Sequence, residues 1–132
     1  MVRDEEAYIE MAIESVLPYV KGLYILDTGS EDDTLSIIRS FNNSKIVVEE
    51  RSFTPKEWYT YPDPKFNKWL EISCRNYAME RAIMIFNPKW LLQVDGDNIV
   101  NGNLFKEFQQ INIPDTCGGL LLNQVPIADR TQ

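Results

Sequence analysis

The sequence predicts an α/β domain with a mainly parallel sheet and helices on both faces, and two observations support this. Short apolar runs alternate along the 132 residues with segments in which apolar side chains recur every three or four positions. This alternation is typical of parallel sheets covered on both sides. Two of the apolar runs, ending at Leu26 and Val94, are followed directly by acidic turns that contain glycine. Ligands of open α/β sheets bind at such strand ends, so these turns are the first candidates for a site.

The first half of the chain predicts two helices, each followed by a strand. The predicted elements are a helix over 5–17, a strand over 23–26, a helix over 35–41 and a strand over 45–49. The first helix places Ile9, Ile13 and Val16 on one face, and Asp4 is in position to cap its start. Thr34, or an aspartate just before it, is in position to cap the second helix.

The second half predicts a long helix between a loop and a strand. The predicted elements are a loop over 50–68, a helix over 68–86, a strand over 90–94, a helix over 104–109 and a strand over 119–125. The long helix has one apolar stripe, formed by Leu70, Cys74, Ala78, Ala82 and Ile85. The loop is aromatic and contains three prolines. It is interpreted as cover for the sheet edge, as a stacking surface for sugars or bases, or as a partner interface.

Two carboxylates one residue apart follow the apolar run over 90–94, in Asp95-Gly96-Asp97. An unpaired charge at the end of a buried strand is costly, and a bound divalent cation is the simplest compensation. Mg²⁺ and Mn²⁺ prefer oxygen ligands and commonly use one or two carboxylates together with substrate phosphates. The motif therefore indicates a metal-assisted phosphate site. The alternative is a solvated acidic turn, because turns favour Asp and Gly for local reasons.

A second acidic turn, Asp27-Thr28-Gly29-Ser30, lies between the predicted strand over 23–26 and the predicted helix over 35–41. A strand, an acidic Gly/Ser turn and a helix form the first half of a nucleotide-binding unit. Turn formation and helix capping alone explain Asp33 and Thr34 well. They explain Asp27 less well, because it still lies at the strand end.

Four motifs occur along the chain in a characteristic order: Met1-Val2-Arg3-Asp4-Glu5-Glu6, Asp27-Thr28-Gly29-Ser30, Arg75-Asn76-Tyr77-Ala78 and Asp95-Gly96-Asp97. Together they resemble a family 2 glycosyltransferase of the GT-A fold, over about residues 1–125. The resemblance implies a single Rossmann-like, nucleotide-sugar-binding domain over residues 1–132 that is incomplete at both ends. Only Met1 and Val2 correspond to the central strand before the opening motif, and family members continue past the equivalent of Gln132.

The resemblance implies roles for four acidic residues. Asp97 is expected to coordinate Mn²⁺ or Mg²⁺ between the protein and the donor diphosphate, and Asp95 to support it through the metal or the ribose. Asp27 is expected to contact the base or the ribose. Asp4 lies near the expected nucleotide edge of the sheet, where it is either a ligand contact or only the cap of the first helix.

Arg75 has two interpretations. A planar guanidinium binds phosphate oxygens well, so Arg75 is a candidate contact for the diphosphate. Alternatively, it is a surface arginine that pairs with Glu71, four residues earlier on the same helix.

The function implied by the resemblance is transfer of a sugar, with inversion, from a nucleotide-diphosphate donor to a glycan, lipid or protein acceptor. The metal would stabilise charge on the leaving diphosphate. The general base is expected beyond Gln132, so no catalytic residue is assigned. Two alternatives stay open: a non-catalytic nucleotide-sugar-binding module, and another metal-dependent nucleotide enzyme such as a nucleotidyltransferase. The Gly-rich phosphate loop typical of nucleotidyltransferases is absent from the sequence.

Composition narrows the classes of function and the expected location. A net charge of −7 argues against a nucleic-acid groove. The absence of histidine excludes Ser-His-Asp triads and histidine metal sites. Cys74 and Cys117 show no metal spacing, and a buried free thiol at Cys74 fits a reducing, cytoplasmic compartment. No apolar run approaches the roughly 20 residues that span a bilayer and no signal peptide is visible, so no transmembrane segment is expected.

Overall fold

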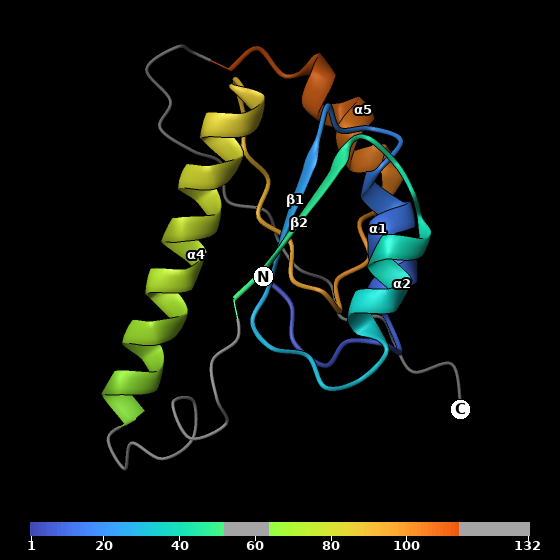
Figure 1. The fold of residues 1–132 in the computed structure, drawn as a ribbon. Coiled ribbons are helices and arrows are strands. Elements are labelled where there is room, and N and C mark those ends of the chain that lie inside the picture. Colours follow the sequence, from blue (N-terminus) through green and yellow to red (C-terminus); the bar gives the residue numbers. More distant parts are fainter. Residues whose placement is uncertain (52–63, 114–132) are drawn as a thin grey trace, which may run out of the picture.

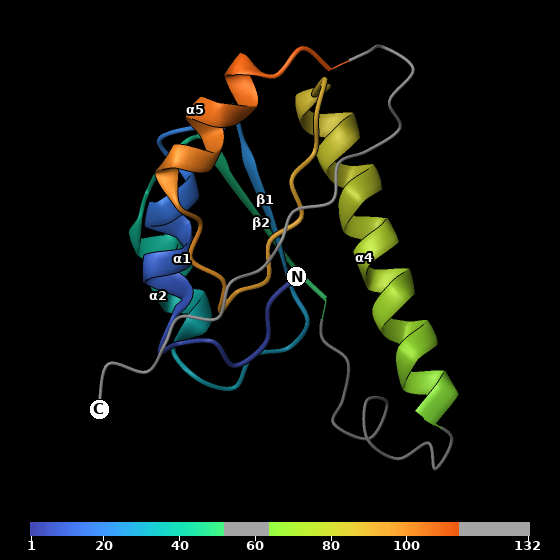
Figure 2. The same ribbon diagram turned by 180° about the vertical axis from the view of Figure 1, so that it is seen from behind.

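The computed structural model describes residues 1–51 and 64–113, in which a two-stranded parallel sheet lies between helices. The described elements are α1 (Ile9–Val16), β1 (Leu23–Asp27), α2 (Thr34–Ser40), β2 (Ile46–Glu50), α4 (Pro64–Phe86) and α5 (Gly102–Gln110). Both ribbon views show α1 and α2 on one side of the sheet and α4 on the other (Figure 1, Figure 2). The predicted α/β class, parallel pairing and helices on both faces are therefore confirmed.

Strand β1 is buried on both of its faces. Ile25 belongs to the core between the sheet and the layer of α1 and α2, and the other buried residues of this core are Val2, Ile9, Ile13 and Ile38. Leu26, the next residue of β1, is fully buried as well. Successive side chains of a strand point to opposite faces, so Leu26 lies on the side that α4 covers. This double burial explains why the β1 sequence is a continuous apolar run.

Glu49 of β2 connects α4 to the sheet through hydrogen bonds. Its carboxylate accepts hydrogen bonds from the hydroxyl of Tyr24 on β1 at 2.6 Å, from the hydroxyl of Tyr77 and from Nε of Arg81 at 3.2 Å. Tyr77 and Arg81 lie one turn apart on α4, so a single carboxylate ties this helix to both strands. The hydrogen bonds from Tyr24 and Tyr77 are the main reason that the pKa of Glu49 is lowered.

The predicted strand over 90–94 is wrong, because within the described residues this segment pairs with no strand. Beyond β1 the described sheet continues only as a single parallel bridge between Val2 and Asp27. A further strand needs a neighbouring run of free backbone N–H and C=O groups, and one bridging residue does not supply it. Leu91 and Leu92 are correspondingly exposed, at 44% and 38%.

Several predicted helix boundaries shift. Helix α1 begins at Ile9 instead of residue 5, and Asp4 is not its cap, because Tyr8 precedes the helix and makes no side-chain capping bond. Helix α4 begins at Pro64, inside the predicted loop over 50–68. Proline suits a first helical turn, since the N–H that it lacks would have no partner within the helix. Helix α5 begins at Gly102, two residues before the predicted start.

The apolar stripe predicted for α4 is only partly buried. Cys74 and Ala82 are buried, whereas Ile85 is 39% exposed. Cys74 is a free thiol, as predicted, and its burial raises the pKa of that thiol. Cys117, the predicted strand over 119–125 and residues 52–63 of the predicted aromatic loop lie outside the described residues.

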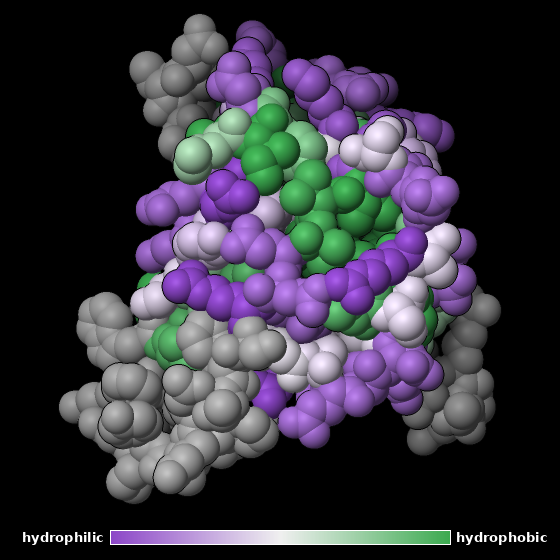
Figure 3. All heavy atoms as spheres, in the orientation of Figure 1, coloured by the Kyte–Doolittle hydropathy of each residue, from purple (hydrophilic) through white to green (hydrophobic). Residues whose placement is uncertain are grey.

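The outer strand β2 leaves part of its apolar surface accessible. Ile46, Val47 and Val48 are half-buried, and Figure 3 shows apolar residues over the sheet on the face seen in Figure 1. Among the helices in residues 1–51 and 64–113, none has the length together with the apolar composition that a membrane-spanning helix requires.

Candidate functional site

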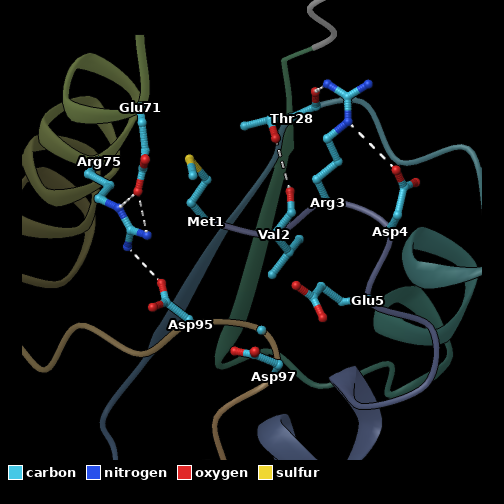
Figure 4. A pocket seen from close by; sticks show the side chains of 11 residues that line it. Met1, Val2, Arg3, Asp4, Glu5, Thr28, Glu71, Arg75, Asp95 and Asp97 are labelled. Carbon is cyan, nitrogen blue, oxygen red and sulfur yellow. Dashed lines mark hydrogen bonds and ion pairs between the residues drawn. The ribbon is translucent and has the colours of Figure 1, made fainter. Parts of the chain in front are cut away.

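A pocket of about 520 Å³ lies at the carboxyl end of β1. Its lining residues come from four segments: residues 1–5, Thr28 just after β1, Glu71 and Arg75 of α4, and the turn over 95–97. Figure 4 shows their side chains around the pocket. Open α/β sheets bind ligands at the carboxyl ends of their strands, so the location is that of a ligand site.

Four of the five residues predicted for the site line this pocket, although they lie far apart in the sequence. They are Asp4, Arg75, Asp95 and Asp97. Asp27, the fifth, is not among the lining residues. The structure thus brings together the opening motif, the Arg75 motif and the Asp95-Gly96-Asp97 motif in one place.

The Asp95-Gly96-Asp97 turn lies against the first residues of the chain. The N–H of Asn98 donates to the carbonyl oxygen of Asp95 at 3.0 Å, which closes the turn. Gly96 is buried, and a Cβ atom on it would lie 2.9 Å from Cγ of Glu5 and 2.9 Å from Cγ1 of Val2. Only glycine allows so close an approach. The close packing of Gly96 against the side chains of Val2 and Glu5 therefore places the carboxylates of Asp95 and Asp97 at the pocket.

Arg75 links α4 to this turn. Its Nη1 donates to Oδ1 of Asp95 at 2.7 Å, and its Nε and Nη2 each lie 2.9 Å from Oε1 of Glu71 (Figure 4). Burial opposes the charge of Arg75, but the hydrogen bonds to Asp95 and Glu71 outweigh it and raise the pKa of the guanidinium. The predicted pairing with Glu71 is therefore confirmed, and Arg75 also lines the pocket, whereas its contact with a diphosphate stays a prediction.

Arg3 is a pocket residue to which the sequence analysis assigned no role. Its Nη1 donates to the carbonyl oxygen of Thr28 at 3.5 Å, and its Nε lies 3.6 Å from Oδ2 of Asp4. Among the lining residues, Arg3 and Arg75 are the basic side chains, and Figure 4 shows them on different sides of the pocket. The available signal was a basic residue inside an otherwise acidic opening motif.

Asp4 forms hydrogen bonds with the loop that precedes α2. Its N–H donates to Oγ of Ser30 at 3.0 Å, and its carboxylate accepts from the N–H of Glu31 at 2.7 Å. Asp4 has a φ of 53°, in a region that aspartate tolerates better than most residues do. The capping role predicted for Asp4 is therefore replaced by a contact between two loops, at the rim of the pocket.

Asp27 is buried, with 2% of its surface exposed, and its carboxylate is satisfied by its own turn. Oδ1 accepts from the N–H groups of Gly29 and Ser30 at 2.9 and 3.0 Å, and Oδ2 accepts from the hydroxyl of Ser30. Aspartate commonly stabilises turns through such local bonds. The contact between Asp27 and a base or ribose stays a prediction.

Acidic side chains crowd around Glu5 at the pocket. Burial raises the pKa of Glu5, and the nearby charges of Asp97, Asp32, Asp95 and Asp4 raise it further. Like charges at this distance oppose each other's ionisation, and a bound cation would relieve that repulsion. A cation next to the Asp95-Gly96-Asp97 turn would therefore lower the repulsion among the acidic side chains around Glu5.

The candidate ligands for a divalent cation at this pocket are the carboxylates of Asp95 and Asp97. In the part of the chain that the structure describes, no group of three or more Asp, Glu or Cys side chains is arranged to hold a metal ion. Asp95 and Asp97 nevertheless place two carboxylates at one pocket. Mg²⁺ is commonly bound by one or two carboxylates plus substrate phosphates. Asp95 and Asp97 are therefore the candidate protein ligands for Mn²⁺ or Mg²⁺ together with a diphosphate.

Comparison of the chain with protein-family models, with curated proteins and with solved structures finds no match. The resemblance to family 2 glycosyltransferases therefore stays an expectation based on the four motifs. A functional assignment must rest on those motifs and on the geometry of the pocket.

Proposed function

We propose that the protein is a glycosyltransferase of the family 2 type, which binds the diphosphate of a nucleotide-sugar donor in this pocket and acts in transfer of the sugar with inversion. The supporting observation is that an Asp-Gly-Asp turn and two arginines line one pocket at the carboxyl end of β1. A diphosphate needs both features, since arginine contacts phosphate oxygens directly and a cation held by carboxylates neutralises the remaining charge.

The proposed roles follow from these positions. Asp97 and Asp95 would hold Mn²⁺ or Mg²⁺, and the bound metal supplies Lewis-acid stabilisation of the leaving diphosphate. Arg75, from α4, and Arg3, from the opening segment, would orient the phosphates. Asp27 would contact the base or ribose through Oδ2, which accepts from the hydroxyl of Ser30, whereas Oδ1 already accepts from two backbone N–H groups.

The GT-A fold and a cytoplasmic location are parts of the same proposal. The GT-A fold is supported by the parallel pair of β1 and β2 and by the bridge from Val2 to β1, where the resemblance expects a central strand. A reducing compartment is supported by the free thiol of Cys74. No described residue is assigned as the general base, which the resemblance expects beyond Gln132. No described residue is assigned to an acceptor site either.

The test is calorimetric titration of the protein with UDP and GDP, in Mn²⁺ and then in EDTA. We expect nucleotide binding in Mn²⁺ that is lost in EDTA, because the two carboxylates repel a diphosphate unless a cation lies between them. Equally tight binding in EDTA would contradict the metal assignment, and no binding to either nucleotide would contradict the donor proposal.

A second measurement addresses turnover. Release of the nucleoside diphosphate from a panel of nucleotide sugars is followed with and without acceptors. We expect slow release that acceptors do not stimulate, because no general base is assigned within the 132 residues and transfer without one is slower by about two to four orders of magnitude. Stimulation by an acceptor would instead place a base within these 132 residues.

A further inference from the structure

Arg75 and Asp95 are bonded to each other inside the site proposed for two different ligands. Nη1 of Arg75 lies 2.7 Å from Oδ1 of Asp95, whereas the proposed function assigns Arg75 to the diphosphate and Asp95 to the cation. A guanidinium and a metal ion repel each other at short range. Arg75 therefore opposes binding of a cation to Asp95 for as long as the two side chains stay paired.

Glu71 holds the same arginine from the other side. Its Oε1 accepts from Nε and Nη2 of Arg75, while Nη1 is the nitrogen that contacts Asp95. The two carboxylates thus hold different edges of one guanidinium, as Figure 4 shows. Breaking the contact with Asp95 frees only the Nη1 edge, and Glu71 still keeps the arginine at the pocket.

The ion pair between Arg75 and Asp95 can also be broken at little cost in free energy. The side chains of Arg75 and Asp95 are 24% and 41% exposed, and ion pairs with this degree of exposure contribute little net stability. The other edge of the guanidinium stays anchored on a helix that Glu49 ties to both strands. A change of partner at Nη1 therefore needs only a movement of the side chain.

We propose that Arg75 is a latch on Asp95. Arg75 leaves Asp95 when a divalent cation binds there, and the freed Nη1 edge contacts the diphosphate that accompanies the cation. Glu71 is a positioning residue that keeps the guanidinium at the pocket in both arrangements. This inference rests on the proposed function for the identity of the two ligands. It implies that cation and diphosphate strengthen each other's binding, because each favours the open latch.

The experiment compares Mn²⁺ binding to the wild-type protein and to Arg75→Gln without nucleotide, by electron paramagnetic resonance of free Mn²⁺. We expect Arg75→Gln to bind Mn²⁺ about two- to fivefold more tightly, which corresponds to the loss of a partly exposed ion pair. In saturating Mn²⁺ the same variant should bind UDP or GDP at least about tenfold more weakly, because a charged hydrogen bond to phosphate is lost. Opposite changes for the two ligands are not expected of a merely structural arginine.

Arg39→Gln is the matched charge control. Arg39 pairs with Glu50, is 57% exposed and does not line the pocket, so this variant loses the same charge and one ion pair elsewhere. We expect both affinities to stay within about twofold of the wild type, as for surface pairs in general. Glu71→Gln should weaken nucleotide binding by less than Arg75→Gln does, because the guanidinium loses one of its two partners but stays present. Circular dichroism checks that each variant is folded.

The Mn²⁺ titration by itself tests whether Arg75 opposes binding of the cation at Asp95. Unchanged or weaker Mn²⁺ binding in Arg75→Gln, equal tightening in Arg39→Gln, or no Mn²⁺ binding to either protein would overturn the latch. Because no nucleotide enters this titration, the result is independent of the donor proposal. Tighter Mn²⁺ binding in Arg75→Gln together with no nucleotide binding to the wild type would support displacement of Arg75 from Asp95 by the cation, and would refute the donor proposal together with the contact between Arg75 and the diphosphate.

Discussion

Two acidic loops lie near the carboxyl end of β1, and they differ in the partners of their carboxylates. In the loop between β1 and α2, the partners are mostly backbone N–H groups. Asp32 accepts from the N–H of Glu6 at 3.0 Å and from that of Thr34 at 2.9 Å, and Asp27 accepts from two N–H groups of its own turn. These backbone donors would lose their partners if the carboxylates were occupied by a ligand.

In the turn over 95–97 the partners are side chains. Asp95 accepts from the guanidinium of Arg75, and Asp97 accepts from the side-chain amide of Asn98 at 2.9 Å. A side-chain partner can rotate away when a ligand arrives, whereas a backbone N–H in a turn cannot do so without a change of the turn. The comparison teaches that acidic residues alone do not mark a binding site, and that exchangeable partners are the more useful criterion.

The largest expected difference between the two loops is in metal-dependent nucleotide binding. Asp97→Ala should weaken Mn²⁺-dependent binding of UDP or GDP by more than about a hundredfold, because even residues that only support metal ligands contribute about 10- to 100-fold. Asp32→Ala should change it less than about threefold, since surface charges contribute little. Calorimetry on the two folded variants is the measurement. Equal losses would show that general negative charge matters and that the position on the turn does not.

The next largest expected difference is in the free energy of unfolding, and here the loop between β1 and α2 is the more sensitive of the two. Asp27→Ala should lower the free energy of unfolding by about 2–4 kcal/mol, because it leaves partly buried donors of Gly29 and Ser30 unsatisfied at about 1–3 kcal/mol each. Asp97→Ala, at an exposed position, should change it by less than about 0.5 kcal/mol. Urea denaturation followed by circular dichroism measures both. A marginal effect of Asp27→Ala would mean that the turn does not depend on its carboxylate.

The smallest expected difference is in the pH dependence of stability. For Asp32, burial raises the pKa, but the hydrogen bonds from Thr34 and the backbone outweigh it, so the pKa is lowered. Its contribution to stability is therefore present above the ordinary aspartate pKa of about 3.9 and is lost as the pH falls through the lowered value. Asp32→Asn should be less stable than the wild type at pH 7, with a difference that narrows in acid.

Glu5 should show the opposite sign. Its pKa is raised by burial and by neighbouring charges, so its contribution to stability is present below the ordinary glutamate pKa of about 4.3 and is lost as the pH rises through the raised value. Glu5→Gln should match the wild type in acid and exceed it in stability at pH 7. Denaturation curves at several pH values measure both variants, and the same sign for both would contradict the opposite pKa shifts of Asp32 and Glu5.

Local sequence patterns predicted those elements whose stability depends on nearby residues. Strands β1 and β2 and helices α2 and α5 agree with the predicted ranges within one or two residues, because apolar periodicity and turn residues act over a few positions. The run over 90–94 has a similar apolar pattern but forms no strand in the described structure. Strand formation needs a partner, and a partner is not a local property of the run.

The sequence by itself determined the α/β class, the acidic turns and the candidate ligand residues, because side-chain chemistry and short-range periodicity can be read directly from it. Only the tertiary structure decided which carboxylates are committed to backbone N–H groups and which face a pocket. It placed Arg75 between Glu71 and Asp95, and it buried Asp27 within its own turn. The physical reason is that a carboxylate takes whichever donors the fold brings within about 3 Å, and residues distant in sequence supply many of those donors.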